Sequence, residues 1–163
     1  MNIRFIDTSV LLNILNVPGR NQDHIEVMYD FRELIKARDV NTLILPLATI
    51  IETGNHIAHI SNGDERRKRA TIFAQYLEKT AKGEAPWEYY CKELDKEDLA
   101  IMAKEFPNCA SMETGIGDMS IIRAYEKYKY NTPAIGNIMI WSLDGHLKGY
   151  NQELKLPVRR RSK

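Results

Sequence analysis

Four acidic residues occupy positions where an α/β fold would bring them together: Asp7, Glu52, Asp118 and Asp144. Asp7 and Asp144 each follow a short apolar run that predicts a strand. Glu52 lies in the helical pattern that follows another strand, and Asp118 begins a further helical pattern. Because ligands in open α/β sheets bind beyond the carboxyl ends of the strands, we expect the four carboxylates to share one cleft.

Four carboxylates in one cleft predict a bound cation. Neighbouring carboxylates repel one another and raise one another's pKa values, which a bound cation would relieve. Oxygen ligands suit Mg²⁺ or Mn²⁺, whereas His56 and His59 lack companions at zinc-ligand spacing. Such a site would polarise a phosphodiester and lower the pKa of bound water, and a second metal would stabilise the leaving oxygen.

Each acid also has a structural interpretation. Asp7 and Asp118 are suited to helix caps, Glu52 to solvent or to a pair with His56, and Asp144 to a turn. For any single acid that interpretation is favoured. The convergence of four acids on one edge of the predicted sheet favours a functional cleft.

The sequence motifs of other catalytic and nucleotide-binding sites are absent from the chain. The chain contains no GxSxG nucleophile motif and no GxxxxGK[ST] phosphate loop. The GxG at 115–117 lacks a preceding strand and a third glycine. Cys91 and Cys109 are far apart and belong to no CxxC pair, which indicates ordinary thiols in a reducing compartment.

Short apolar strands alternate with amphipathic helices, which predicts an α/β fold with a mostly parallel sheet. The expected strands are 3–6, 42–45, 87–91 and 137–143. The expected helices are 10–16 capped by Thr8 or Ser9, 23–38, 46–60, one beginning at Asp64, one capped by Asp95 and ended by Pro107, and one from Asp118 to Pro133. Apolar spacing places Ile25, Met28, Tyr29 and Ile35 on one packed face, and Leu99, Met102, Ala103 and Phe106 on another.

The length of the chain fits one domain. The chain has 163 residues, 44% of them hydrophobic, and a net charge of +1. We expect a domain over 1–150 and a polar, then basic, tail over 151–163. No apolar run has the length of a membrane span and no signal peptide is visible, so a cytoplasmic protein without a membrane partner is expected.

Two basic runs stand out in the chain. Each is either an RNA-binding surface or a solvated face. The first comprises Arg66, Arg67, Lys68 and Arg69, and the second comprises Arg159, Arg160, Arg161 and Lys163.

Four segments resemble, in order, the motifs of the PIN-domain nuclease family: FIDTSVLLN (5–13), LPLATIIE (45–52), GDMSIIRAY (117–125) and WSLDGHL (141–147). The resemblance implies a three-layer α/β/α sandwich with a central, mostly parallel sheet. It also implies metal-binding acids and hydroxyl groups that orient them or a water. The implied acids are Asp7, Glu52, Asp118 and Asp144, and the implied hydroxyls are those of Thr8 or Ser9 and of Ser142. Leu147 departs from the aromatic residue usual at its position.

The resemblance further implies a metal-dependent endoribonuclease that uses Mg²⁺ or Mn²⁺. Many small relatives are toxins of VapBC-type pairs, so an antitoxin and a homodimer are expected partners beside RNA. One alternative is a degenerate PIN fold that binds RNA or serves as a scaffold. A haloacid-dehalogenase-like phosphatase is disfavoured, because Ser9 stands where that family requires a second aspartate.

Overall fold

A computed structural model describes residues 1–90, 94–132 and 136–154 of the chain. Cys91 and Pro133 lie outside the described residues, as do the basic residues at 159–161 and Lys163. No helix among the described residues is long and apolar enough to cross a membrane.

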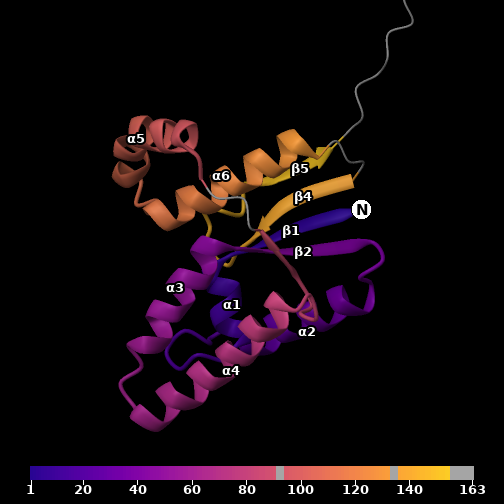
Figure 1. The fold of residues 1–163 in the computed structure, drawn as a ribbon, viewed down its shortest axis with the longest axis vertical. Coiled ribbons are helices and arrows are strands. Elements are labelled where there is room, and N and C mark those ends of the chain that lie inside the picture. Colours follow the sequence, from indigo (N-terminus) through magenta and orange to yellow (C-terminus); the bar gives the residue numbers. More distant parts are fainter. Residues whose placement is uncertain (91–93, 133–135, 155–163) are drawn as a thin grey trace, which may run out of the picture.

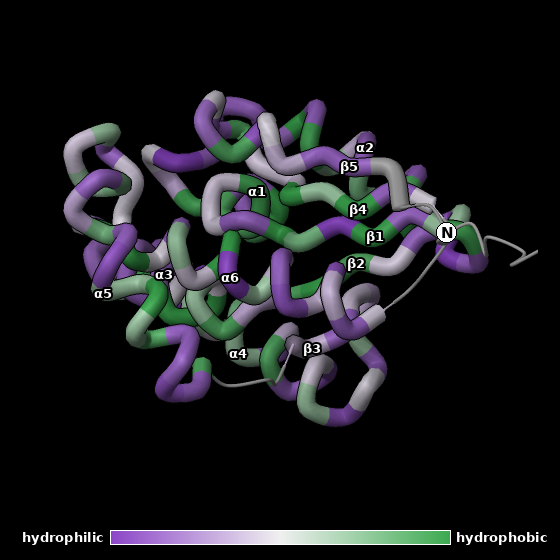
Figure 2. The backbone as a smooth tube through the Cα atoms, turned by 90° about the horizontal axis from the view of Figure 1, so that it is seen from above, coloured by the Kyte–Doolittle hydropathy of each residue, from purple (hydrophilic) through white to green (hydrophobic). Residues whose placement is uncertain are grey.

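A five-stranded sheet with the order β3-β2-β1-β4-β5 forms the centre of the fold (Figures 1 and 2). β1 (Asn2–Ile6) is flanked by parallel strands β2 (Asn41–Pro46) and β4 (Gly136–Trp141), and β3 (Glu88–Tyr90) extends the parallel sheet beyond β2. β5 (Asn151–Leu154) pairs antiparallel with β4. The predicted α/β class with a mostly parallel sheet is therefore confirmed, whereas β5 forms in a segment that the sequence analysis placed in the polar tail.

Six helices connect the strands within the described residues: α1 (Thr8–Ile14), α2 (His24–Lys36), α3 (Leu47–Ala58), α4 (Gly63–Ala81), α5 (Lys96–Ser111) and α6 (Ile116–Asn131). In Figure 1, α5 and α6 lie on one side of the central strands, and α1, α2 and α4 lie on the other. This arrangement is compatible with a three-layer sandwich.

Two hydrophobic cores form because neighbouring residues of a strand point to opposite faces of the sheet. Phe5 packs in the core beneath α6, and Ile6 packs in the core formed with α1, α2 and α4. Ile44 and Leu45 of β2 divide between the same two cores. Burial on both faces explains why these strands are nearly continuous apolar runs (Figure 2).

The packed face of α2 differs from the predicted one. Ile25 and Tyr29 are 86% and 66% exposed, whereas Val27 and Phe31 are buried. Two residues along a helix correspond to a rotation of about 200°, so burial of Val27 turns Ile25 and Tyr29 toward solvent. Met28 and Ile35 are partly buried against the core, as expected.

α5 also differs from its prediction. Asp95 caps it as expected, in a capping box with Asp98, but Pro107 lies inside the helix instead of ending it. A proline removes only its own N–H bond and crowds one carbonyl, so the helix continues past it for one more turn. Met102 is buried, while Leu99 is 55% exposed.

Charged side chains join α5 to α6. The buried Asp98 carboxylate accepts hydrogen bonds from Arg123 at 2.9 Å and from Lys127 at 2.6 Å. Burial of Asp98 acts to raise its pKa, but the hydrogen bonds from Lys127, Arg123 and the Asp95 cap outweigh it and hold the pKa well below its usual range. No sequence pattern predicted this ion-pair network, because its partners lie on two different helices.

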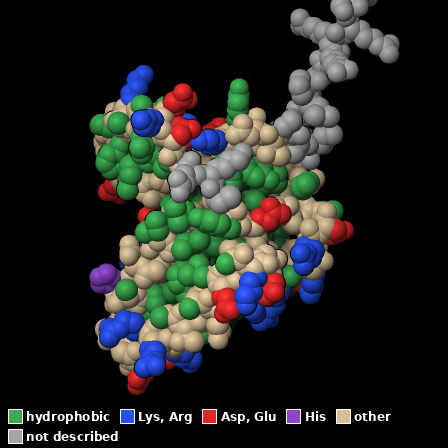
Figure 3. All heavy atoms as spheres, viewed as in Figure 1, with side chains coloured by type: hydrophobic (Ala, Val, Ile, Leu, Met, Phe, Trp, Pro, Cys, Tyr) green, Lys and Arg blue, Asp and Glu red, His purple; other side chains and the backbone are tan. Residues whose placement is uncertain are grey.

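Some hydrophobic side chains remain on the surface (Figure 3). Among the described residues they include Leu47 and Ile51 of α3, which are 45% and 54% exposed. Both line an apolar pocket of about 200 Å³ to which Tyr90 and Leu94 also contribute.

Candidate active site

Asp7 is the N-cap of α1, directly after β1. Its Oδ2 accepts hydrogen bonds from the Ser9 backbone N–H at 3.3 Å and from the Ser9 hydroxyl at 2.6 Å. Thr8 and Ser9, which the sequence analysis offered as caps, instead lie within the first turn of α1. Asp7 is 1% exposed, so this carboxylate is held rigidly at the end of the strand.

The end of β4 is joined to the same carboxylate by Ser142. The buried Ser142 hydroxyl donates to Asp7 Oδ2 at 2.8 Å and accepts from the Asp144 backbone N–H at 3.0 Å. Ser9 Oγ also accepts from the Leu143 N–H at 3.0 Å. Two hydroxyls predicted to support the acids therefore link the ends of β1 and β4.

Every hydrogen bond that Asp7 accepts through its side chain from the described residues reaches Oδ2. Its Oδ1 accepts none from that part of the chain. Oδ2 thus accepts the hydrogen bonds that hold the carboxylate in place, and Oδ1 remains available for a ligand.

The topology explains why β1 and β4 supply this edge. β1 leads through α1 and α2 to β2 on one side, while β4 leads to β5 on the other. Connections leave the two adjacent strands in different directions, which opens a crevice at their carboxyl ends. Asp7 and Asp144 lie at this crevice.

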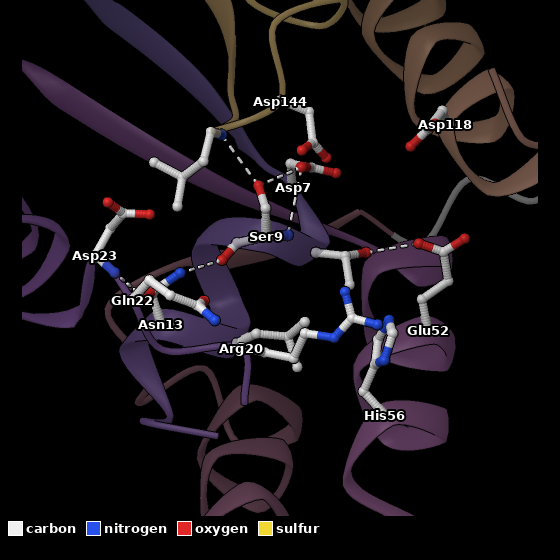
Figure 4. A pocket seen from close by; sticks show the side chains of 13 residues that line it. Asp7, Ser9, Asn13, Arg20, Gln22, Asp23, Glu52, His56, Asp118 and Asp144 are labelled. Atoms are coloured by element: carbon white, nitrogen blue, oxygen red, sulfur yellow. Dashed lines mark hydrogen bonds between the residues drawn. The ribbon is translucent and has the colours of Figure 1, made fainter. Parts of the chain in front are cut away.

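Glu52 of α3 faces the first turn of α6 (Figure 4). Its Oε2 accepts a hydrogen bond from the Thr8 hydroxyl at 2.7 Å. Its Oε1 lies so close to Gly117 that a Cβ atom there would be 1.8 Å away. Only a residue without a side chain allows α6 to approach the carboxylate at this distance.

Asp118 is in the first turn of α6, one residue after Gly117, and not at its cap, which is Gly115. Its Oδ2 lies 3.3 Å from His146 Nε2, in the loop that follows Asp144. Asp118 is thus placed across the crevice from Asp7 (Figure 4).

The pKa of Asp144 is raised by its surroundings in the crevice. Burial raises the pKa of its carboxyl group, and the negative charges of Asp7 and Asp118 raise it further, while His146 and Lys148 act in the opposite direction. Repulsion of this kind is what the sequence analysis expected of carboxylates brought together.

All four predicted acids line one pocket of about 280 Å³ (Figure 4). Within the described residues, however, no three His, Cys, Asp or Glu side chains lie close enough to form a ready metal-binding group. The oxygen donors, the open Asp7 Oδ1 and the mutual repulsion at Asp144 fit a hard divalent cation in kind. The pocket therefore holds the donors of such a site in a spread arrangement.

The structure adds residues to this pocket that the sequence analysis missed. They are Leu12, Asn13, Arg20, Gln22, Asp23 and Leu143; His56, treated there as an ordinary histidine, also lines it. Arg20, Gln22 and Asp23 belong to the connection between α1 and α2, which carries no helical or strand periodicity. The sequence signal that could have located them is the cluster of polar residues that follows Asp7 and its helix.

Three members of the predicted basic run, Arg66, Arg67 and Lys68, are exposed, whereas Arg69 is partly buried. Arg69 donates to the Leu15 carbonyl at 3.3 Å and pairs with Glu65 at 3.2 Å. Arg66 donates to the Ile60 carbonyl at 2.8 Å, and Lys68 lies 3.8 Å from Glu65 Oε1.

Comparison with family models and with curated proteins found no match for this chain.

Proposed function

We propose that this protein is a metal-dependent endoribonuclease of the PIN type. The observation that carries the proposal is the convergence of Asp7, Glu52, Asp118 and Asp144, from four separate segments, on one polar pocket at the carboxyl ends of β1 and β4. The order of the four sequence motifs supports the same family and its three-layer fold.

The acids would hold Mg²⁺ or Mn²⁺, with Asp7 and Asp144 on one side of the pocket and Asp118 and Glu52 on the other. The bound ion would supply Lewis-acid activation of the phosphate and of a water nucleophile. The repulsion that Asp7 and Asp118 exert on Asp144 supports a cation as the natural occupant.

The remaining polar residues orient these acids. Ser9 and Ser142 fix Asp7 through Oδ2 and leave Oδ1 toward the pocket. Thr8 fixes Glu52 through Oε2. Fixed ligands reduce the reorganisation needed when substrate arrives, which is a large part of catalysis by electrostatic positioning.

Cellular role follows from the family resemblance alone. We propose a toxin that cuts RNA and is restrained by an antitoxin, in preference to an RNA-processing enzyme, with a homodimer as the expected assembly. The second candidate function is a degenerate PIN protein that binds RNA without cutting it. The spread arrangement of the acids favours that alternative.

The test is cleavage of a mixed RNA pool by purified protein with Mg²⁺ or Mn²⁺. An EDTA control and the Asp7→Asn variant are compared with Asp39→Asn, which changes an exposed aspartate away from the pocket. Cleavage lost with EDTA and with Asp7→Asn, but retained in Asp39→Asn, supports the nuclease. A folded wild type that neither cleaves RNA nor shows a change on metal titration supports the degenerate alternative.

A further inference from the structure

One wall of the acidic pocket carries a cation, Arg20. Arg20, in the connection between α1 and α2, lines it together with His56 of α3 (Figure 4). Among the described residues, the Arg20 guanidinium forms no ion pair and no hydrogen bond, although Glu52, Asp23 and Asp7 line the same pocket. An arginine left free in acidic surroundings retains all its donors for a ligand.

The connection that carries Arg20 is fastened to α1. The side chain of Asn13, which is 3% exposed, donates to the Ser9 carbonyl at 2.9 Å and accepts from the Asp23 backbone N–H at 3.0 Å. The Asn21 amide donates to Asn16 Oδ1 at 2.6 Å. The same helix positions Asp7, so the position of Arg20 is coupled to that of the acids.

A second pocket of about 380 Å³ continues from this wall. Arg20 and His56 line both pockets, and the second also includes His59 and Ser61. Burial lowers the pKa of His56, and the positive charges of Arg20 and His59 lower it further, against the raising effect of Glu52. The lowered pKa favours the neutral form of His56, so Arg20 supplies the charge of this wall and the imidazole supplies a hydrogen-bonding group.

An RNA chain that reaches the acids must cross a region of negative charge. A phosphate beside the reacting one therefore needs a cation within the pocket, and a guanidinium binds phosphate through two parallel hydrogen bonds. Arg20 and His56 line both pockets, so an RNA chain that continues from the acids into the second pocket would pass these two side chains.

We propose that Arg20 and His56 form a binding subsite for the phosphate adjacent to the scissile one, with the RNA strand continuing into the pocket lined by His59 and Ser61. This inference rests on the proposed function for the identity of the ligand. The subsite itself is built from side chains and requires no metal.

The test is binding of a fluorescein-labelled single-stranded RNA oligonucleotide in EDTA at several salt concentrations. Arg20→Gln is compared with wild type, with Arg20→Lys, and with Arg32→Gln, which changes an exposed arginine of α2 that lines neither pocket. We expect Arg20→Gln to weaken binding about tenfold and to reduce the salt slope by about 0.7, the value for one phosphate contact to a single strand. Arg20→Lys keeps most of the slope, and Arg32→Gln matches wild type.

Steady-state cleavage gives the second readout. With Mg²⁺ or Mn²⁺, Arg20→Gln raises KM about tenfold and changes kcat by less than about threefold, as expected for a binding contact. The subsite is overturned if wild type fails to bind RNA in EDTA, or if Arg20→Gln binds and cleaves like wild type. Arg20-dependent binding without any metal-dependent cleavage would refute the nuclease and leave the subsite standing.

Discussion

Gly117 of α6 lies against the carboxylate of Glu52 on α3, so closely that a Cβ atom would be 1.8 Å from Oε1. The contact brings the first turn of α6, and with it Asp118, to the carboxylate that Thr8 holds from the other side. Two helices that follow different strands thereby bring their acids to one pocket.

Gly117→Ala is predicted to displace the Glu52 side chain and break its hydrogen bond to Thr8. Alanine in a helix normally stabilises a protein by about 0.5–1 kcal/mol relative to glycine. Here the lost bond, worth about 1 kcal/mol, offsets that gain, so the free energy of unfolding should stay level or fall. RNA cleavage should fall at least about tenfold.

The matched control for that prediction is Gly54→Ala in α3. The nearest atom to a Cβ there is Phe73 Cε1 at 3.7 Å, an ordinary contact, so this variant should be stabilised in urea unfolding and keep its activity. If Gly117→Ala is stabilised as much as Gly54→Ala, the close approach to Glu52 has no energetic consequence. Gly117→Ala in a Glu52→Ala background should recover the gain.

Ser142→Ala is predicted to lower the free energy of unfolding by about 1–3 kcal/mol. It leaves the buried Asp7 Oδ2 with fewer donors and removes the acceptor of the Asp144 N–H. Cleavage should fall by more than the loss of folded protein explains. Ser111→Ala, which removes an exposed hydroxyl bonded to the Asn108 carbonyl, should change neither quantity, and equal behaviour of the two variants would refute the role of Ser142.

Asp144→Asn is predicted to separate charge repulsion from metal binding. Without metal, it removes a negative charge beside Asp7 and Asp118 and should raise the Tm by about 1–3 °C. Added Mn²⁺ should stabilise wild type by several degrees through preferential binding to the folded state, and this shift should be smaller in Asp144→Asn. Asp39→Asn should show the wild-type shift. An identical Mn²⁺ response in all three proteins would exclude Asp144 from the metal site.

Asp98 is predicted to make stability fall in acid. Its pKa is lowered in the folded state, so its stabilising effect is present above the ordinary pKa of an aspartate and disappears as the pH falls toward the folded value. Asp98→Asn should cost about 1–3 kcal/mol at pH 7, because Arg123 and Lys127 lose their anion, and the cost should shrink on acidification below about pH 4.

Urea unfolding at a series of pH values measures this effect, with Asp39→Asn as the exposed control. Hydrogen exchange should show that α5 opens before the sheet in Asp98→Asn, since this anion attaches α5 to α6. A cost that is independent of pH would mean that Asp98 acts through packing and not through charge.

The residues that sequence reasoning located share a direct relation to strand ends. Asp7 and Asp144 were predictable because each follows an apolar strand, and parallel strands end at one edge; β4 ends at Trp141, however, and not directly before Asp144 as the apolar run predicted. Ser142 and Thr8 followed from their neighbours in the motifs. The α/β class followed from the alternation of strand and helix patterns.

The residues that sequence reasoning missed depend on contacts distant in the chain. Arg20 lies in a connection without periodicity, and its position depends on the buried Asn13. Asp98 resembles any first-turn acid until α6 brings Arg123 beside it. The edge strand 151–154 has little apolar character and forms because β4 offers it a hydrogen-bonding edge.

The two oxygens of Asp7 have different roles, one structural and one open to a ligand, and this difference has an evolutionary consequence. Oδ2 caps α1 and joins it to β4, so the fold would select for this aspartate even in a lineage that no longer performed chemistry. The side chain of Asp144 accepts no hydrogen bond from the described residues, and the negative charges of Asp7 and Asp118 oppose its ionisation. Among descendants that abandon catalysis, we expect Asp144 to vary first and Asp7 last, so retention of Asp7 alone would be a poor marker of an active enzyme.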